Sequence, residues 1–426
     1  MSIRRLAYSV LIYCFVPLAL LRLWFRSRSN ADLRQYWLER FGYQLRGASK
    51  PSSSPIICIH AVSVGETLGA KALIQAIIDT YPQHQVLITS TTLTGRNTVQ
   101  QLFAGQVRQC YFPYDLVGSV QRFLRVVRPE KVIIIETEIW PNFYAACKQR
   151  NIPIILANAR LSQRSMRAYL KVQRLSAETL NCVALIAARG QQDAEHFIQI
   201  GADAARTSVT GNIKFDLPLP EKQIQQASIL QQQWGQQRPV WVAASTHQGE
   251  DEVLLAMHQN LIKHFPDLLF ILVPRHPERF NSVYQLAQKT GLSVQRRSSE
   301  THFLTSTQII LADSMGEMFT WYAAANIVFM GGSLVNVGGH NPLEPAALAR
   351  PIISGKYIFN FPEVFPLLQT EKAAWVLDTS SEIEQQILHL LHAADKAKQA
   401  GLAGQIVVQA HQGAVNNVLD KIAEMG

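Results

Sequence analysis

The sequence lacks the patterns that mark several common kinds of site. It has no C-x-x-C pair, no Walker A sequence, no G-x-S-x-G nucleophile elbow and no H-E-x-x-H helix. These absences argue against a zinc site, P-loop nucleotide hydrolysis, α/β-hydrolase chemistry and zinc proteolysis. The five cysteines are scattered, which predicts reduced structural thiols rather than a disulfide framework; they are Cys14, Cys58, Cys110, Cys147 and Cys182.

Acidic residues are in the minority. Against 40 Lys and Arg there are 31 Asp and Glu, which gives a formal net charge of +9. A basic surface favours anionic partners, and without a zinc finger, an RNP-like motif or a basic-aromatic tract we prefer lipid or phosphate to nucleic acid. The chain has 426 residues, 48% of them hydrophobic and 17% charged, which suits two globular domains of about 200 residues each.

The first segment is apolar and bracketed by arginines. Residues 6–21 read LAYSVLIYCFVPLALL, between Arg4-Arg5 and Arg22. The run is slightly short for a spanning helix, although Arg22 could snorkel, and no A-x-A-like cleavage site follows it. We therefore predict a membrane anchor over residues 1–28, either spanning, with the catalytic body on the cytoplasmic side, or lying in the interface. A buried soluble helix is the alternative.

Apolar runs typical of strands alternate with helical patterns along the rest of the chain. Such runs without polar alternation predict parallel, doubly wound sheets. The proline-rich segment Leu217–Gln223 interrupts the rhythm and is the predicted linker. We expect two facing Rossmann-like domains, 29–216 and 217–426, with ligands in the cleft outside the carboxyl ends of the strands. The predicted strands are 56–61, 86–92, 109–113, 131–138, 152–160, 183–189, 239–246, 268–277, 307–313, 326–333 and 351–355.

Three candidate residues in the first half could carry acid–base or charge-stabilising chemistry. Glu66 follows a strand and opens a helix, where the helix dipole favours an ionised carboxylate that can take a proton from a hydroxyl; a helix-capping glutamate is the equal alternative. Glu136 and Glu138 end a predicted strand and should share one face. They could divide acid and base roles, although for Glu136 we prefer a salt bridge. Lys214 precedes the linker and could stabilise a leaving phosphate, or it is an ordinary solvated lysine.

The second half contains three segments suited to a nucleotide. Arg275 ends a strand and can bind phosphate or carboxylate with two hydrogen bonds. Residues 315–317 form a turn before a helix, whose backbone N–H groups could hold phosphate. The segment from Gly331 to Pro345 is rich in glycines that permit close backbone approach to a ligand. Within it we expect Pro342 at the first position of a helix and Glu344 to accept hydrogen bonds from ribose hydroxyls.

Together these segments resemble a known family. HAVSVGE, ETEIWPN, NARLS, GNIKFD, PRHPERF and GGSLVNVGGHNPLEPAA are similar to the Kdo (3-deoxy-D-manno-octulosonic acid) transferases of lipopolysaccharide assembly, and the resemblance covers nearly the whole chain. It implies a GT-B fold whose first domain binds the acceptor and whose second binds the CMP-sugar. It also implies inverting transfer of Kdo from CMP-Kdo to a lipid A precursor, lipid IVA, at the cytoplasmic face of the inner membrane, without metal or cofactor.

The resemblance assigns roles residue by residue. Glu66 becomes the general base, and Glu138 and Lys214 become stabilisers of the transition state. The implied CMP contacts are Pro274, Arg275, Met315, Gly316, Glu317, Asn341, Pro342, Leu343 and Glu344. Two other functions remain open: another GT-B enzyme, such as a UDP-sugar transferase or an NDP-sugar epimerase, and a non-catalytic binder of anionic lipid surfaces. Nucleotide preference separates the first from Kdo transfer, and turnover separates the second.

Overall fold

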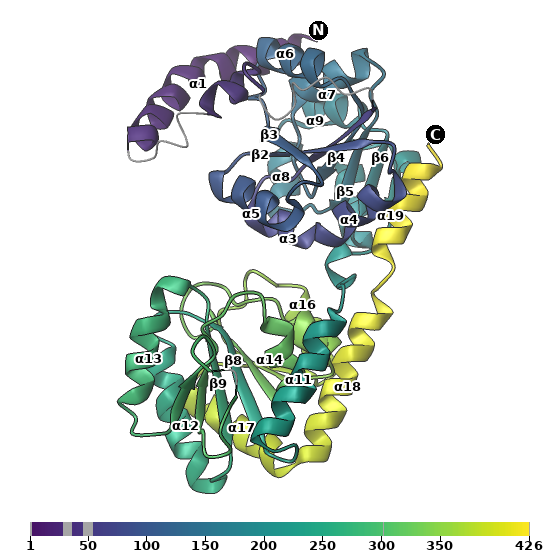
Figure 1. Ribbon diagram of the computed structural model, residues 1–426. Coiled ribbons are helices and arrows are strands. Elements are labelled where there is room, and N and C mark those ends of the chain that lie inside the picture. The colour runs from purple at the N-terminus through teal and green to yellow at the C-terminus, as the bar shows by residue number, and fades with distance from the viewer. Residues whose placement is uncertain (1, 29–35, 46–53, 301, 426) are drawn as a thin grey trace. The chain divides into compact units, whose positions relative to one another are not determined.

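The computed structural model describes residues 2–28, 36–45, 54–300 and 302–425. The chain forms two compact units (Figure 1): unit 1 contains residues 1–216 and 412–426, and unit 2 contains residues 217–411. Each unit is built on one seven-stranded sheet in which every pairing is parallel. Parallel strands covered by helices on both faces are buried, which explains why the sequence shows continuous apolar runs.

The sheet of unit 1 has the order β3-β2-β1-β4-β5-β6-β7. The chain runs outward from the centre through β1, β2 and β3 and then returns to β4 beside β1. The order therefore reverses between β1 and β4, and ligands of such sheets bind at that point, beyond the carboxyl ends of the strands. The strands are β1 (Ile56–His60), β2 (Gln85–Ser90), β3 (Arg108–Tyr111), β4 (Pro129–Ile135), β5 (Ile154–Ala159), β6 (Leu185–Ala188) and β7 (Thr207–Val209).

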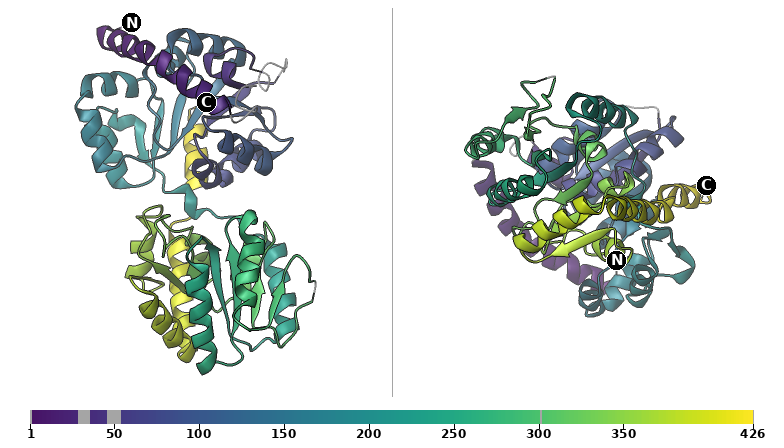
Figure 2. Two further views of the ribbon diagram at one scale, coloured as in Figure 1. Left: turned by 90° about the vertical axis from the view of Figure 1, so that its left-hand side faces the viewer. Right: turned by 90° about the horizontal axis from the view of Figure 1, so that it is seen from below.

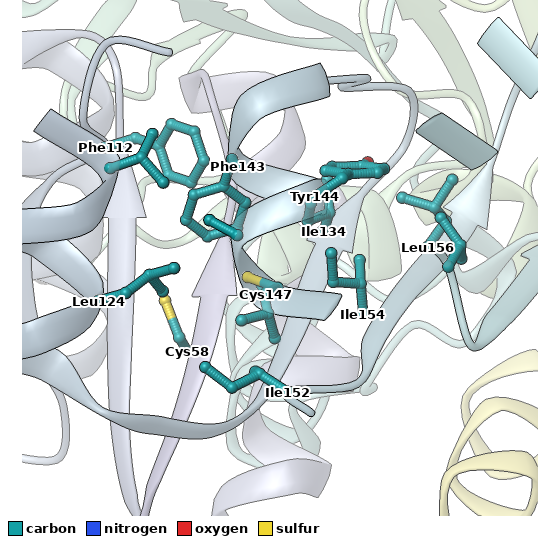
Figure 3. Close-up of a cluster of buried hydrophobic side chains, with 14 of the residues drawn as sticks. Cys58, Phe112, Leu124, Ile134, Phe143, Tyr144, Cys147, Ile152, Ile154 and Leu156 are labelled. Carbon is teal, nitrogen blue, oxygen red and sulfur yellow. The ribbon is translucent and has the colours of Figure 1, made fainter. Parts of the chain in front are cut away.

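Two apolar cores cover the faces of this sheet. One core contains Cys58, Phe112, Ile134 and Phe143, which pack together as Figure 3 shows. The other core contains Ile57 and Ile59, because successive side chains of a strand point to opposite faces of the sheet. The helices of unit 1 are α1 (Ile3–Arg28), η1 (Trp37–Phe41), α3 (Val64–Gly69), α4 (Lys71–Thr80), α5 (Leu93–Phe103), α6 (Val117–Val127), α7 (Pro141–Gln149), α8 (Gln163–Leu170), α9 (Gln173–Leu180), α10 (Gln191–Gln199), η2 (Ala204–Arg206), η3 (Ile213–Phe215) and α19 (Ala414–Ala423).

The sheet of unit 2 has the order β10-β11-β9-β8-β12-β13-β14, so its reversal lies between β8 and β12. Its strands are β8 (Val240–Thr246), β9 (Leu269–Pro274), β10 (Val294–Arg296), β11 (Ile309–Leu311), β12 (Ile327–Met330), β13 (Ile352–Gly355) and β14 (Ala374–Leu377). Its helices are α11 (Glu221–Trp234), α12 (Asp251–His264), η4 (Pro277–Arg279), α13 (Phe280–Gln288), α14 (Met318–Ala324), α15 (Leu343–Ala347), α16 (Val364–Thr370), α17 (Ser380–His392) and α18 (Ala394–Ala410).

The last helix corrects the predicted domain limits. The chain divides at 216/217, the position predicted, but residues 412–426 belong to unit 1 rather than to the second domain. The Asp216 carboxylate explains the return, because it accepts hydrogen bonds of 2.6 Å from the backbone N–H groups of Gly413 and Val415 at the start of α19. α19 then packs against α4, β6 and η3.

The first turns of helix α1 are hydrogen-bonded to the rest of unit 1. Ser9 is buried and donates a hydrogen bond of 3.1 Å to the Asn142 side chain at the start of α7, and Ser2 donates one of 2.6 Å to Glu178 on α9. Beyond those turns the helix extends past the helices it packs against (Figures 1 and 2). Among the described residues, no helix combines the length and the apolarity needed to cross a membrane.

Candidate functional site

The carboxylates predicted in unit 1 lie together where its strand order reverses. Glu66 follows β1, and Glu136 and Glu138 follow β4. β4 ends at Ile135, one residue before Glu136, whose backbone adopts the left-handed conformation (φ 61°). Such a conformation is costly for a residue with a side chain and concentrates at functional sites. The prediction that Glu136 and Glu138 share a strand face was therefore wrong, because the strand alternation stops before the first of them.

Glu66 is bound within its own turn. Ser63 caps α3 by accepting a hydrogen bond from the Glu66 N–H, and the Glu66 carboxylate accepts one of 2.8 Å from the Val62 N–H. Burial raises the pKa of Glu66 to about 7, opposed by the Val62 hydrogen bond and helped by the charges of Glu136 and Glu138. The expectation that the helix dipole would keep this carboxyl readily ionised therefore understated burial, and the group titrates near neutral pH.

Lys214 forms an ion pair with Glu136. Its Nζ lies 3.0 Å from the Glu136 Oε1, and both side chains are about one-quarter exposed. The salt bridge predicted for Glu136 is thus present, and its partner is the lysine singled out independently. Lys214 lies on η3, whose preceding Asn212 accepts a hydrogen bond of 3.1 Å from the Lys214 N–H. Asn158 of β5 accepts another from the Ile213 N–H, which holds this segment at the end of the sheet.

Glu138 completes the group. Burial and the charge of Glu136 raise the pKa of Glu138, and the Tyr144 hydroxyl donates a hydrogen bond to the Glu138 backbone carbonyl. The site therefore combines three carboxylates with one lysine. A carboxyl that titrates near neutral pH can accept a proton from a substrate hydroxyl, and a neighbouring cation can stabilise negative charge that develops during reaction.

Sequence reasoning missed Gly69. A Cβ at this position would lie 2.8 Å from the Cε of Lys214, so the glycine leaves room for the lysine side chain to reach Glu136. His60, in the same motif as Glu66, is not part of the site. It is fully buried, stacks on Phe112 and hydrogen-bonds to Thr89, and burial lowers its pKa to about 3.

In unit 2, Arg275 and Arg279 have different surroundings although both follow β9. Arg279 forms an ion pair with Asp251 and donates a hydrogen bond of 2.8 Å to the Thr246 carbonyl. Across the described part of the chain, no carboxylate forms an ion pair with Arg275, whose charge acts on His247 and His340. Arg275 is therefore available to an anionic ligand. Pro274, also a predicted contact, is the last residue of β9.

The first part of the glycine-rich segment after β12 is held by a buried carboxylate. The fully buried Glu250 carboxylate accepts four backbone hydrogen bonds, at 2.7–3.0 Å, from the N–H groups of His247, Gly332, Ser333 and Leu334. These amides are therefore satisfied by the protein and do not face a ligand. Glu250, which the sequence analysis did not identify, fixes this loop against the end of β8.

The remaining predicted nucleotide contacts lie in two loops of unit 2. Gly316 has a left-handed backbone with open space around its Cα, and Met315 is 62% exposed. Glu317 forms a bidentate ion pair with Arg297, which lowers the pKa of Glu317.

The second loop opens α15. Asn341 accepts a hydrogen bond of 3.1 Å from the Leu343 N–H, and its amide donates one of 3.4 Å to Glu344. Glu344 lies in the first turn of α15, as predicted. Pro342 occupies the N-cap, one position before the expected first helical residue.

Three histidines that the sequence did not bring together meet beside Arg275. The Nε2 atoms of His247 and His340 are 2.9 Å apart, and their rings are stacked. The ring of His276 meets that of His247 edge to face, with centroids 5.2 Å apart. No group of three or more His, Cys, Asp or Glu side chains within the described ranges is arranged to hold a metal ion.

Comparisons with known proteins identify the family of this chain. Residues 35–217 match the family model described as 3-deoxy-D-manno-octulosonic-acid transferase (kdotransferase). The chain is 39% identical to the 3-deoxy-D-manno-octulosonic acid transferase of Haemophilus influenzae over 98% of this chain and 97% of that protein. It is 32% identical to the enzyme of the same name from Bordetella pertussis over 98% of both chains.

A solved structure shows the fold alone. The UDP-GlcNAc 2-epimerase of Neisseria meningitidis superposes with a TM-score of 0.56 at 13% identity, covering 86% of this chain and all of the epimerase. An epimerase and a transferase can share this two-unit architecture because the chemistry depends on the site residues rather than on the fold. The family match and the two full-length relatives decide between them: the chain belongs to the 3-deoxy-D-manno-octulosonic acid (Kdo) transferase family of glycosyltransferases.

Proposed function

We propose that this protein transfers Kdo from CMP-Kdo to a hydroxyl of the lipid A precursor lipid IVA, with inversion at the anomeric carbon. The observation that supports this most is the group formed by Glu66, Glu138 and the Glu136–Lys214 ion pair, in a chain of this family. A proton acceptor, a second carboxylate and a cation meet at the place where parallel sheets bind their ligands.

Glu66 is the proposed general base. Its pKa of about 7 places it near the pH at which a base is most effective, since it is partly ionised and still basic enough to take a proton. It would accept the proton of the acceptor hydroxyl while that oxygen forms a bond to the anomeric carbon and the bond to the CMP phosphate breaks. A single displacement of this kind inverts the anomeric configuration. Lys214 and Glu138 would stabilise charge that develops at the reacting centre.

Unit 2 is the proposed donor-binding unit. Within the described residues Arg275 forms no ion pair with a carboxylate, and it can bind the phosphate of CMP with two hydrogen bonds. The turn around Gly316 leaves open space for a ligand, and Asn341 and Glu344 present polar atoms at the start of α15. These positions are the ones that the family resemblance assigns to CMP.

Helix α1 is the proposed membrane contact, at the cytoplasmic face of the inner membrane. Nine of its apolar side chains are 36–60% exposed, a large apolar surface for a water-facing helix. A lipid acceptor carries its acyl chains in the bilayer, so a helix in the membrane interface would keep the enzyme beside its substrate. The exposed residues are Val10, Leu11, Tyr13, Phe15, Leu18, Leu20, Leu21, Trp24 and Phe25.

The test is transfer of Kdo to tetraacylated lipid IVA, with CMP-Kdo generated in the assay, for the wild type and for Glu66→Gln. We expect transfer by the wild type, and loss of at least about 10²-fold in kcat for the variant, because a general base contributes a factor of that size or more. The variant should still gain thermal stability from CMP. Absence of transfer by the wild type, together with absence of a thermal shift with CMP, would refute the proposal and direct attention to other nucleotide sugars.

A further inference from the structure

The trio of His247, His276 and His340 in unit 2 is held in place by the surrounding loop. Glu250 fixes the backbone of His247 and of Gly332 through the same carboxylate oxygen, at 2.8 and 2.7 Å. A Cβ at position 332 would lie 3.3 Å from the ring of His340 and 3.4 Å from that of His247. The buried Glu250 carboxylate thus fixes the backbone, and the missing side chain of Gly332 leaves room for the two imidazole rings to remain in contact.

The trio is accessible to a ligand. The side chain of His276 is 47% exposed; its Nδ1 lies 3.9 Å from the exposed Glu278 carboxylate, which leaves Nε2 for a ligand. The side chains of His247 and His340 are partly exposed. The contact between His247 and His340 uses one nitrogen of each ring, and only one of those two nitrogens needs to carry a proton. In a neutral pair the accepting ring carries its own proton on Nδ1 and can donate that N–H to an anion.

The trio stands where cationic side chains are scarce. Of the four arginines near these loops, Arg279 is paired with Asp251, Arg296 with Asp313 and Arg297 with Glu317. Arg275 alone among the four has no carboxylate partner in the part of the chain that the structure describes. One free guanidinium can satisfy one anionic group, and the imidazoles beside it offer hydrogen-bond donors for a second anion.

The chemistry of the family's sugar provides a second anion. An ulosonic acid carries a carboxylate on its anomeric carbon, and in the nucleotide-activated sugar the same carbon also carries the phosphate ester. The donor therefore presents two negative groups on one carbon, whereas the neutral hexoses of most sugar nucleotides present only the phosphate groups. A donor site for an ulosonic acid needs hydrogen-bond donors for the carboxylate directly beside those for the phosphate.

We propose that His340, with His247 and His276, forms the subsite for the carboxylate of the transferred ulosonic acid, next to Arg275 at the phosphate. The inference rests on the proposed function and extends it, because it names the residues that distinguish this donor from nucleotide-activated neutral sugars. His340 and His276 donate to the carboxylate, and His247 fixes the orientation of His340 through their shared hydrogen bond.

The test compares binding of CMP, which lacks the carboxylate, with use of CMP-Kdo generated in the assay. His340→Leu removes both ring nitrogens, and His340→Asn retains one N–H near the position of Nδ1. His264→Asn, on the exposed last turn of α12, is the matched control. CMP binding is measured with and without a chelator, and wild-type transfer is compared with and without chelator treatment of the transferase before CMP-Kdo is generated, since three imidazoles could bind adventitious metal.

We expect His340→Leu to raise the KM for CMP-Kdo about tenfold or more, because a hydrogen bond to a charged group is lost. The dissociation constant of CMP should stay within about threefold of the wild-type value by the same reasoning. His340→Asn should recover part of the loss, and His264→Asn should match the wild type.

Four results would overturn the inference. The first is an unchanged KM for CMP-Kdo in His340→Leu while the wild type transfers Kdo, which leaves the proposed function intact. The second is an equal loss of CMP and CMP-Kdo affinity, which would assign the trio to the nucleotide or to loop structure. The third is inhibition of the wild type by the chelator, which would make the trio a metal site. The fourth is a wild type that binds CMP but does not transfer Kdo, which removes the proposed function itself.

Discussion

Replacing Glu66 with glutamine should make the protein inactive and more stable. The folded-state pKa of Glu66 is raised from 4.5 to about 7, so the folded protein favours the neutral carboxyl. Below pH 4.5 Glu66 is protonated in both the folded and the unfolded state, so its burial does not reduce the unfolding free energy. As the pH rises from 4.5 to 7, the unfolded state ionises more readily than the folded state, and the wild type loses stability. Above pH 7 the loss is complete and constant.

The magnitude follows from the size of the shift. A rise in pKa from 4.5 to about 7 corresponds to about 3.5 kcal/mol at about 1.4 kcal/mol per unit, and solvent screening of a partly exposed group reduces this to about 1–2 kcal/mol. Glutamine resembles the neutral carboxyl in shape, and its amide oxygen can still accept the hydrogen bond from Val62. The variant should therefore gain about 1–2 kcal/mol in unfolding free energy above pH 7 and nothing at pH 4.5.

The assay is urea unfolding of wild type and Glu66→Gln between pH 4.5 and 8.5, followed by tryptophan fluorescence. Glu221→Gln, in the first turn of α11 in unit 2, is the matched control, against which the gain of Glu66→Gln is measured. A Glu66→Gln variant that is less stable than the wild type at pH 8, or equally stable at every pH, would refute the electrostatic account of this site. Such a result would show that the carboxylate acts mainly as a helix cap.

Four further perturbations test other parts of the structure. Glu136→Gln should move the acidic limb of the kcat/KM profile about one pH unit lower, since it removes a negative charge near the base and leaves Lys214 unpaired; an unmoved limb would argue against coupling. Asp216→Ala should lower the unfolding free energy, measured by urea unfolding, by about 1–3 kcal/mol because two hydrogen bonds are lost. An unchanged unfolding free energy would contradict this prediction. Gly332→Ala should lower the unfolding free energy by about 1–2 kcal/mol because residue 332 has a left-handed backbone, and it should raise the KM for CMP-Kdo. An unchanged KM would show that this loop does not contribute to donor binding. Leu18→Glu should weaken co-sedimentation with anionic phospholipid vesicles about tenfold, and undiminished binding would rule out the apolar face of α1 as the membrane contact.

The central strands could be predicted from the sequence, and three edge strands could not. β1, β4, β8 and β12 are buried on both faces, so their apolar runs are continuous and stand out from the rest of the chain. The missed strands, β7, β10 and β14, lie at sheet edges and have only three or four residues. β7 (TSV) and β10 (VQR) have no apolar run, and the apolar run of β14 (AWVL) is too short for its pattern to separate a strand from a helix.

Family motifs identified the acidic residues of unit 1, but local sequence could not show how they are arranged. Lys214 is 78 residues from Glu136, and only the folded sheet makes them partners. His247 and His340 are separated by 93 residues, and neither has a neighbouring sequence that indicates the other. Glu250 shows the same limit, because the sequence could not indicate that the amides of Gly332, Ser333 and Leu334 are occupied by this carboxylate.

The return of α19 to unit 1 makes unit 2 an insertion within unit 1. Val415, Val418 and Ile422 are buried in one core of unit 1, so that core is incomplete until the last segment of the chain has been synthesised. Residues 217–411 emerge from the ribosome earlier as one continuous piece, and domains generally fold as units during synthesis. Unit 2 can therefore complete its fold first, while the nascent unit 1 keeps an open apolar face that only the final turns of the polypeptide can cover.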